Sequence, residues 1–310
     1  MFPSTIASSA RGLATAADAL GLAVSAPAAA TAFIDTHCHL DLTLKSARAR
    51  SKGPGGPADE AELAHALFPP ALAAVVDICC DVPVNRRGSR LADAFARGGR
   101  WPGKYYFTVG CHPLSAHRHT PEDAAAIEAA LVHPAAVAVG ECGLDYKKST
   151  HRAVQAEVFR QQIRLALRLG LPFVVHTREA DDDTLAILEA EVPVGHPFHV
   201  HCFTSSVELG NAILDRWPNA VIGITGVITY ASLDTTPALL RGRGLAVLDR
   251  IVLETDSPYM VPANVRPRNR RVSHSGMIPF VAARVADLLE CPLERVLTAT
   301  TANARRVYGI

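Results

Sequence analysis

From residue 33 onward, the sequence alternates short apolar runs with amphipathic segments, and this alternation limits the fold more than any other feature. Eight runs have β-strand character, at residues 33–39, 74–81, 105–113, 136–146, 172–177, 198–204, 220–226 and 251–258. The clearest helix spans 151–170, where apolar residues recur at helical spacing before Gly170. Because strands that alternate with helices form parallel sheets, eight such units predict an α/β fold, a (β/α)8 TIM barrel. A doubly wound open sheet is the alternative, but no glycine-rich phosphate turn follows the first run.

The chain divides into an N-terminal extension and one large domain. Residues 1–32 are rich in alanine and carry one arginine and one acid. We expect them to be a disordered or loosely helical extension, with an organellar targeting segment as the alternative. Residues 33–310 form the expected barrel, and a hydrophobic content of 49% is enough for a sizeable core.

Charge and cysteine content narrow the class of protein. The 31 Lys and Arg residues balance 30 Asp and Glu residues, so any attraction for phosphate must come from local clusters of charge. The seven cysteines form no CxxC pair and no spacing typical of a secreted scaffold, which favours an intracellular protein, cytoplasmic or nuclear. No run approaches the roughly 18 apolar residues of a membrane span. We therefore expect no membrane partner, and we expect a monomer.

Residues suited to metal binding or acid–base chemistry stand near the ends of these runs. His37 and His39 are two apart, so both side chains would project from the same face of a strand. Six of the eight runs end in such residues: His37, His39, His112, Glu141, His176, His201 and Asp256. Because the carboxyl ends of barrel strands converge on one mouth, we expect all of these side chains to be neighbours. The alternative for any single one is an ordinary strand-end histidine or capping carboxylate.

Strand alternation also predicts the environment of nearby residues. Four cysteines adjoin these polar positions and are expected to face the surrounding helices as small core residues: Cys38, Cys111, Cys142 and Cys202. His199 and Glu254 would lie two residues deeper than His201 and Asp256, on the same faces. We expect His199 to be a hydrogen-bonded core histidine and Glu254 to be a buried acid that orients a ligand.

The motifs that contain these residues resemble those of the TatD family of metal-dependent nucleases, within the amidohydrolase-like barrels. They run in the family's order over 33–310, as "DTHCHLD" (35–41), "VGCHP" (109–113), "VGECGLDY" (139–146), "VVHTREA" (174–180), "HCFTSS" (201–206) and "ETDSPY" (254–259). The resemblance implies that His37 and His39 bind one cation and that His176 and His201 bind a second. It also implies that Glu141 bridges the two cations. Asp256 would bind the first cation beside the attacking water.

The expected chemistry is metal-assisted hydrolysis, with Asp256 and Glu141 as catalytic residues. Two divalent cations, Mg²⁺, Mn²⁺ or Zn²⁺, suit these donors, and such a pair can clamp a phosphodiester and activate water. We therefore expect a nuclease, an exonuclease acting on DNA and alternatively RNA, with single-stranded or frayed ends preferred. Two other functions stay open: hydrolysis of an amide, ester or lactone, and nucleic-acid binding without catalysis. Glu141 in place of a carboxylatable lysine disfavours the first, and the full ligand set disfavours the second.

Two basic segments are candidates for substrate binding. Segment 264–274 carries four guanidinium groups, which match phosphate oxygens well: Arg266, Arg268, Arg270 and Arg271. The family resemblance implies substrate contacts from Arg268 and Asn269, and we expect a third contact from His112. A solvated run of charge is the alternative for this segment. Loop 42–58 is a second basic candidate, with disorder as its alternative.

Overall fold

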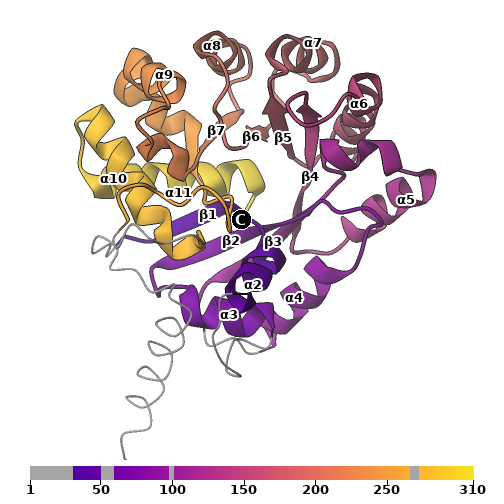
Figure 1. Ribbon diagram of the computed structural model, residues 1–310, viewed down its shortest axis with the longest axis horizontal. Helices are drawn as coiled ribbons and strands as arrows, with labels where there is room; N and C mark the ends of the chain where they lie inside the picture. Colours follow the sequence, from indigo (N-terminus) through magenta and orange to yellow (C-terminus); the bar gives the residue numbers. More distant parts are fainter. Residues whose placement is uncertain (1–30, 50–58, 98–100, 266–271) are drawn as a thin grey trace, which may run out of the picture.

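Eight parallel strands form one sheet in this computed structural model, which describes residues 31–49, 59–97, 101–265 and 272–310 (Figure 1). Each strand pairs with the next one along the chain. The strands are β1 (Phe33–Cys38), β2 (Leu72–Cys79), β3 (Lys104–Val109), β4 (Ala136–Asp145), β5 (Phe173–Arg178), β6 (Phe198–Val200), β7 (Val221–Ile224) and β8 (Ile251–Leu253). Each of the eight predicted runs overlaps one strand, and the predicted (β/α)8 TIM barrel is confirmed.

Helices surround this sheet (Figure 1). They are α2 (Leu40–Arg48), α3 (Glu60–Leu67), α4 (Arg87–Ala96), α5 (Pro121–Ala130), α6 (Arg152–Leu169), α7 (Asp181–Glu191), α8 (Val207–Arg216), α9 (Thr235–Arg243), α10 (Ile278–Leu289) and α11 (Leu293–Tyr308). The short 3-10 helices are η1 (Pro113–Arg118), η2 (Gly226–Thr229), η3 (Gly244–Arg250) and η4 (Ser275–Met277). Helix α6 matches the prediction and ends at Gly170, whose φ of 65° lies in the left-handed region that favours glycine. No helix within the described ranges has both the length and the apolar character needed to cross a membrane.

Some expectations concern residues that the structure does not describe. Of the N-terminal extension 1–32, only residues 31 and 32 are within the described ranges. The predicted loop 42–58 is wrong in its first part, because Lys45 and Arg48 lie in helix α2, and residues 50–58 lie outside the described ranges. The same holds for residues 266–271, which include the four arginines of the predicted substrate segment.

A short parallel contact between the β1 end and the segment after β8 closes the barrel. Cys38 forms a parallel bridge with Ser257. The Asp256 amide donates to the His37 carbonyl at 2.8 Å, and the His39 amide donates to the Ser257 carbonyl at 2.9 Å. These bonds place the side chains of His37, His39 and Asp256 at the same end of the barrel.

A buried carboxylate reinforces this closure. Asp35 on β1 accepts hydrogen bonds from the Thr255 amide at 3.0 Å and from the Thr255 hydroxyl at 2.7 Å. Burial raises the pKa of Asp35 to about 7, although the bonds to Thr255 oppose the rise. Thr36 adds a bond from its hydroxyl to the Leu253 carbonyl at 3.1 Å. The first and last strands are therefore joined by side chains as well as by backbone.

The core lies between the strands and the surrounding helices. Its largest fully buried side chains include Trp217, Phe107, Phe159, Phe173 and Phe198. Phe198 packs between Phe173, at 5.1 Å between ring centroids, and Trp217, at 5.6 Å. This apolar layer fixes the strands and so fixes the positions of the side chains at their ends.

Asp77 on β2 holds the backbone that follows His39. Its side chain is fully buried and accepts from Arg87 Nη1 at 2.6 Å, from the Tyr105 hydroxyl at 2.6 Å and from the Leu40 amide at 3.0 Å. Since Leu40 is the next residue after His39, this cluster fixes where the chain leaves the end of β1.

We predict that Arg87→Ala destabilises the protein by about 3 kcal/mol, because it leaves the buried Asp77 charge without its partner. The free energy of unfolding, measured by urea denaturation, checks this. Arg168→Ala is the matched control, since Arg168 forms a surface ion pair with Glu128 at 2.9 Å and surface pairs contribute little. Equal unfolding midpoints for the two variants would contradict the prediction.

Candidate metal centre

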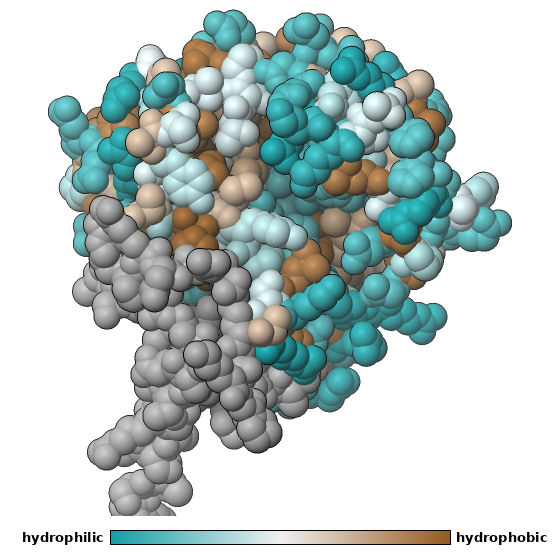
Figure 2. Space-filling view, in the orientation of Figure 1, coloured by the Kyte–Doolittle hydropathy of each residue, from teal (hydrophilic) through white to brown (hydrophobic). Residues whose placement is uncertain are grey.

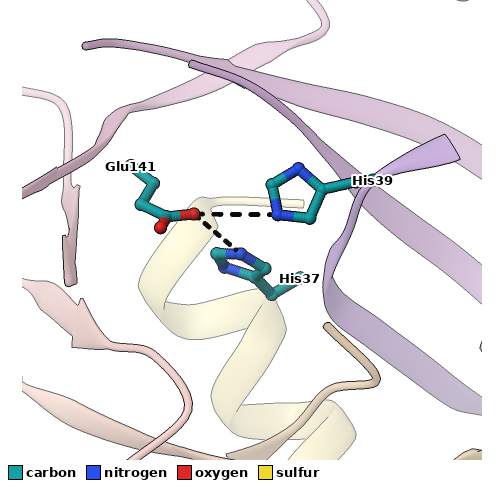
Figure 3. A group of neighbouring side chains, drawn as sticks. All are labelled: His37, His39 and Glu141. Atoms are coloured by element: carbon teal, nitrogen blue, oxygen red, sulfur yellow. Dashed lines mark ion pairs between the residues drawn. The ribbon is translucent and has the colours of Figure 1, made fainter. Parts of the chain in front are cut away.

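One oxygen of the Glu141 carboxylate faces the histidines of β1. Glu141 Oε2 lies 3.1 Å from His37 Nε2 and 3.8 Å from His39 Nε2, and Figure 3 shows both imidazoles pointing at this carboxylate. Asp256 approaches the same imidazoles, with its Oδ1 3.7 Å from His37 Nε2 and 3.4 Å from His39 Nε2. Two imidazoles and two carboxylates thus surround one point.

The other oxygen of Glu141 faces three further histidines. Glu141 Oε1 lies 3.1 Å from His112 Nε2, 2.9 Å from His176 Nδ1 and 3.4 Å from His201 Nε2. His176 Nδ1 and His201 Nε2 are 3.0 Å apart. The ring of His201 also stacks on that of His37, with centroids 4.0 Å apart. The Glu141 carboxylate therefore lies between two groups of imidazoles, with one oxygen facing each group.

The backbone of β4 aims Glu141 into the barrel. The pairing of β4 with β5 has a register shift between Val139 and Cys142, and such bulges redirect a side chain. Gly140 has a φ of 130°, and a Cβ there would lie 2.7 Å from the Val174 carbonyl oxygen. Only glycine suits this position, and it leaves the following Glu141 side chain at the centre of the mouth.

The two carboxylates of the site are held in the ionised form. Burial alone would raise the pKa of Glu141, but the imidazoles of His201 and His112 hold that pKa well below its usual range. Burial likewise opposes ionisation of Asp256, but its hydrogen bond with His39 keeps the pKa low. In turn, Asp256 overcomes the effect of burial on His39 and raises its pKa to about 9. Negative charge is thus concentrated where it could attract cations.

The donor set fits divalent cations. Among the residues that the structure describes, buried atoms without a hydrogen-bond partner include His37 Nε2 and Glu141 Oε2. A buried polar atom without a partner costs folding free energy, so these lone pairs are available to bind a ligand. Three groups bring possible ligand atoms within 4.8 Å of one another: His37, His39 and Glu141; His37, His201 and Asp256; His112, Glu141 and His176. Nitrogen and carboxylate donors of this kind suit Zn²⁺, Mn²⁺ and Mg²⁺.

His112 reaches the site from outside the strands. It is the N-cap residue of η1, and its Nδ1 accepts the Leu114 amide at 3.0 Å. Because Nδ1 is an acceptor, a neutral His112 carries its proton on Nε2, the atom that faces Glu141. Burial lowers the pKa of His112, which favours this neutral form.

A cavity of about 550 Å³ opens over these groups. Side chains of the metal centre line it, including His39, His112, Glu141, His176, His201 and Asp256. The structure thus brings together every candidate ligand named from the sequence. Arg268 and Asn269 lie outside the described residues, so their predicted substrate contacts stay predictions.

One expectation about the cysteines is wrong. Cys38, Cys111 and Cys142 are buried, as expected, but Cys202 lines the cavity. Strand β6 ends at Val200, and Cys202 has a φ of 43°, so strand alternation no longer sets the direction of its side chain.

A second buried network lies beneath the metal centre. His199 is fully buried, with Nδ1 2.7 Å from the Tyr308 hydroxyl and Nε2 3.0 Å from Glu254 Oε2. Glu254 also accepts the Cys202 amide, and burial raises its pKa to about 8. Gly223 on β7 makes room for the pair, because a Cβ there would lie 2.4 Å from His199 Nε2. His199 is thus the hydrogen-bonded core histidine and Glu254 the buried acid that the sequence predicts.

Sequence reasoning missed three residues around the cavity. Asp145 Oδ2 lies 3.4 Å from His176 Nε2, and Asp145 Oδ1 accepts the Lys148 amide at 2.9 Å. Lys148 and Arg178 line the cavity as well. The signal for Asp145 was present, because it follows Glu141 by four residues and so shares its face of β4.

A closed parallel barrel with a histidine–carboxylate centre at the carboxyl ends of its strands defines a metal-dependent hydrolase with an amidohydrolase-like fold. Residues 34–309 match the family model described as TatD related DNase. The chain belongs to this family.

Individual relatives agree with the family. A human protein named 3'-5' RNA nuclease TATDN2 is 32% identical over 92% of this chain, which spans 36% of that longer protein. A Cronobacter turicensis protein named 3'-5' ssDNA/RNA exonuclease TatD is 33% identical over 77% of this chain and 89% of its own length. The crystal structure of YJJV, a TatD homolog from Escherichia coli, has the same fold, with a TM-score of 0.71 at 23% identity over 90% of this chain and 98% of that one.

We predict that excess Mn²⁺ raises the melting temperature of the wild-type protein and that His176→Ala abolishes most of this rise. A ligand at 100 times its Kd stabilises the folded state by about 2.7 kcal/mol. Thermal unfolding with and without the cation measures the effect. His133→Ala is the matched control, because His133 pairs with Asp93 at 3.5 Å and does not line the cavity. A rise of equal size in both variants would speak against the assigned site.

Proposed function

We propose that the protein is a divalent-metal-dependent 3'–5' exonuclease that hydrolyses phosphodiester bonds of single-stranded DNA and RNA. One observation carries the proposal: the two oxygens of Glu141 face two separate groups of histidines, as a carboxylate that bridges two cations would. The activities named for the human and Cronobacter relatives support the polarity and the substrates. The proposal keeps the division into an extension, 1–32, and a catalytic barrel, 33–310.

The residues divide into two sets of ligands around Glu141. We assign one cation to His37, His39, Asp256 and Glu141, and the other to His176, His201 and Glu141. When bound, the pair supplies positive charge that polarises the phosphodiester and lowers the pKa of water toward ~7.

The chain's own groups carry the proton and hold the substrate. Asp256 is ionised, so its carboxylate accepts the proton of the attacking water. The water oxygen bonds to phosphorus, the bond from phosphorus to the leaving sugar oxygen breaks, and that oxygen takes a proton from solvent. His112 carries its proton on Nε2 and donates it in a hydrogen bond to a non-bridging phosphate oxygen, which holds the phosphodiester in place.

An exposed aromatic ring supports a nucleic-acid substrate over an amide or a lactone. Tyr259 lines the cavity, and its side chain is 53% exposed. Its amide bonds to the Asp256 carbonyl at 3.0 Å, so the ring is anchored beside the proposed proton acceptor. Nucleobases stack on such rings with little dependence on sequence. A cavity of about 550 Å³ is within the range of small-ligand sites and suits one terminal nucleotide.

We predict that phosphodiester hydrolysis requires a divalent cation. Purified protein, treated with chelator and then supplied separately with Mg²⁺, Mn²⁺ or Zn²⁺, is assayed on single-stranded DNA and RNA labelled at the 5' end. We expect no cleavage without cation and a ladder shortened from the 3' end with it. Full activity after exhaustive chelation would refute the proposal, and so would hydrolysis of esters or lactones without cleavage of either nucleic acid.

We predict that Asp256→Asn lowers kcat about 100-fold or more, the scale of a lost general base, and retains more metal than His176→Ala. A carboxamide still offers an oxygen to a cation, whereas alanine offers none. Metal analysis of both variants, together with steady-state kinetics, checks the assignment. The reverse order of metal content would show that the two roles have been assigned wrongly.

A further inference from the structure

Two basic side chains stand together on one side of the cavity. Lys148 follows β4, Arg178 ends β5, and both line the cavity. The two strands are adjacent, with Asp145 and Arg178 in register. Both basic side chains are exposed, and Figure 2 shows hydrophilic side chains gathered on this part of the surface, near α6 and α7. Lys148 and Arg178 therefore form a local cluster of positive charge in a chain whose net charge is only +1.

The charges of this pair are available to a ligand. The neighbouring Lys147 is bound to Glu179 at 2.7 Å and does not line the cavity. In the described part of the chain, neither Lys148 nor Arg178 has such an ion-pair partner. Arg178 does lie in the field of Asp145, but the oxygens of Asp145 are directed at His176 and at the Lys148 amide.

The opposite side of the cavity carries negative charge. Asp41, which follows β1, and Asp81, which follows β2, line the cavity there. Arg87 offsets part of the charge on Asp41, at 3.5 Å, but Asp81 is exposed. A polyanionic strand is repelled on this side and attracted on the side of β4 and β5.

Asp145 sets the spacing between the metal centre and the basic pair. One of its oxygens lies 3.4 Å from His176 Nε2, and the other accepts the Lys148 amide at 2.9 Å. Because the same carboxylate contacts both, the turn that carries Lys148 is held at a fixed distance from His176. The basic pair is thus tied to the metal centre through Asp145, beside the place where a phosphodiester would be cleaved.

We propose that Lys148 and Arg178 form a subsite for the backbone phosphate next to the scissile one, so that the uncleaved strand leaves the mouth across β4 and β5. The inference rests on the proposed function and names the direction of the strand within that site. A single-stranded substrate then has its terminal base near Tyr259 and its next phosphate at the basic pair.

The experiment compares two short substrates with cation present. A dinucleoside monophosphate has only the scissile phosphate, whereas a trinucleoside diphosphate adds one neighbour. We expect wild-type kcat/KM to be about tenfold higher on the longer substrate, as two exposed ion pairs allow. In Lys148→Ala/Arg178→Ala this preference disappears, while turnover of the dinucleotide and metal content stay unchanged. Lys147→Ala is the matched control and keeps the preference.

A binding measurement gives a second readout. In the Asp256→Asn background, the affinity for a labelled single-stranded oligonucleotide is followed against salt, where each phosphate contact contributes about 0.7 to the slope. We expect the double substitution to flatten the slope by about this amount and Lys148→Arg to retain it.

The outcomes separate the two proposals. If wild-type protein cleaves neither substrate with any cation, the proposed function fails and the subsite fails with it. If it cleaves both and the double variant keeps both the preference for the longer one and the full slope, the function stands and the subsite is refuted. Equal losses on both substrates would also refute it, since they would place the pair at the scissile phosphate.

Discussion

The site depends on the closure of the barrel between its first and last strands. Asp35 and Thr255 lie 220 positions apart in the chain, and their hydrogen bonds hold β1 against the segment that follows β8. The backbone bond from Asp256 to His37 then sets one proposed proton acceptor directly beside one candidate ligand. If this contact opened, the side chains of β1 would separate from Asp256 even with every strand intact. Chemistry at the mouth is thus a property of the closed sheet.

The polar groups buried in the barrel interior lower the free energy of unfolding. TIM barrels ordinarily fill this space with layers of branched apolar side chains. Here Glu141, His37 and His201 are buried together, and buried ionic groups are weak contributors to stability. The apolar layer around Phe198 and Trp217, between strands and helices, offsets that deficit. Stability and chemistry therefore occupy two concentric regions of one fold.

The sequence predicts the barrel well, because alternation of strands and helices is a local pattern that survives in the fold. It also predicts which side chains meet at the mouth, since that needs only the ends of the strands. Alternation fails at Cys202, because the strand stops at Val200 and the chain turns with a positive φ. The predicted 198–204 run is therefore longer than the strand it contains.

Other features of the site needed three dimensions. Lys148 lies in a turn, so no periodicity places it, and its role emerges only from its position next to Arg178 on the adjoining strand. Asp145 lies within a motif that the sequence already singles out, but its contact with His176 crosses between two strands. Charge asymmetry across the mouth is likewise invisible in a net charge of +1. Arg268 and Asn269 remain predictions.

Gly223, His199 and Glu254 limit one another's size. A side chain there would occupy the space now filled by His199 and Glu254, so these positions share one fixed volume. A methyl group gained at one of them is compatible with the fold only if atoms are lost at another. Among descendants of this sequence, a larger residue at position 223 should therefore come with a smaller one at position 199 or 254. For the same reason, a designer could replace the polar pair His199 and Glu254, beneath the metal centre, by apolar side chains of the same total volume.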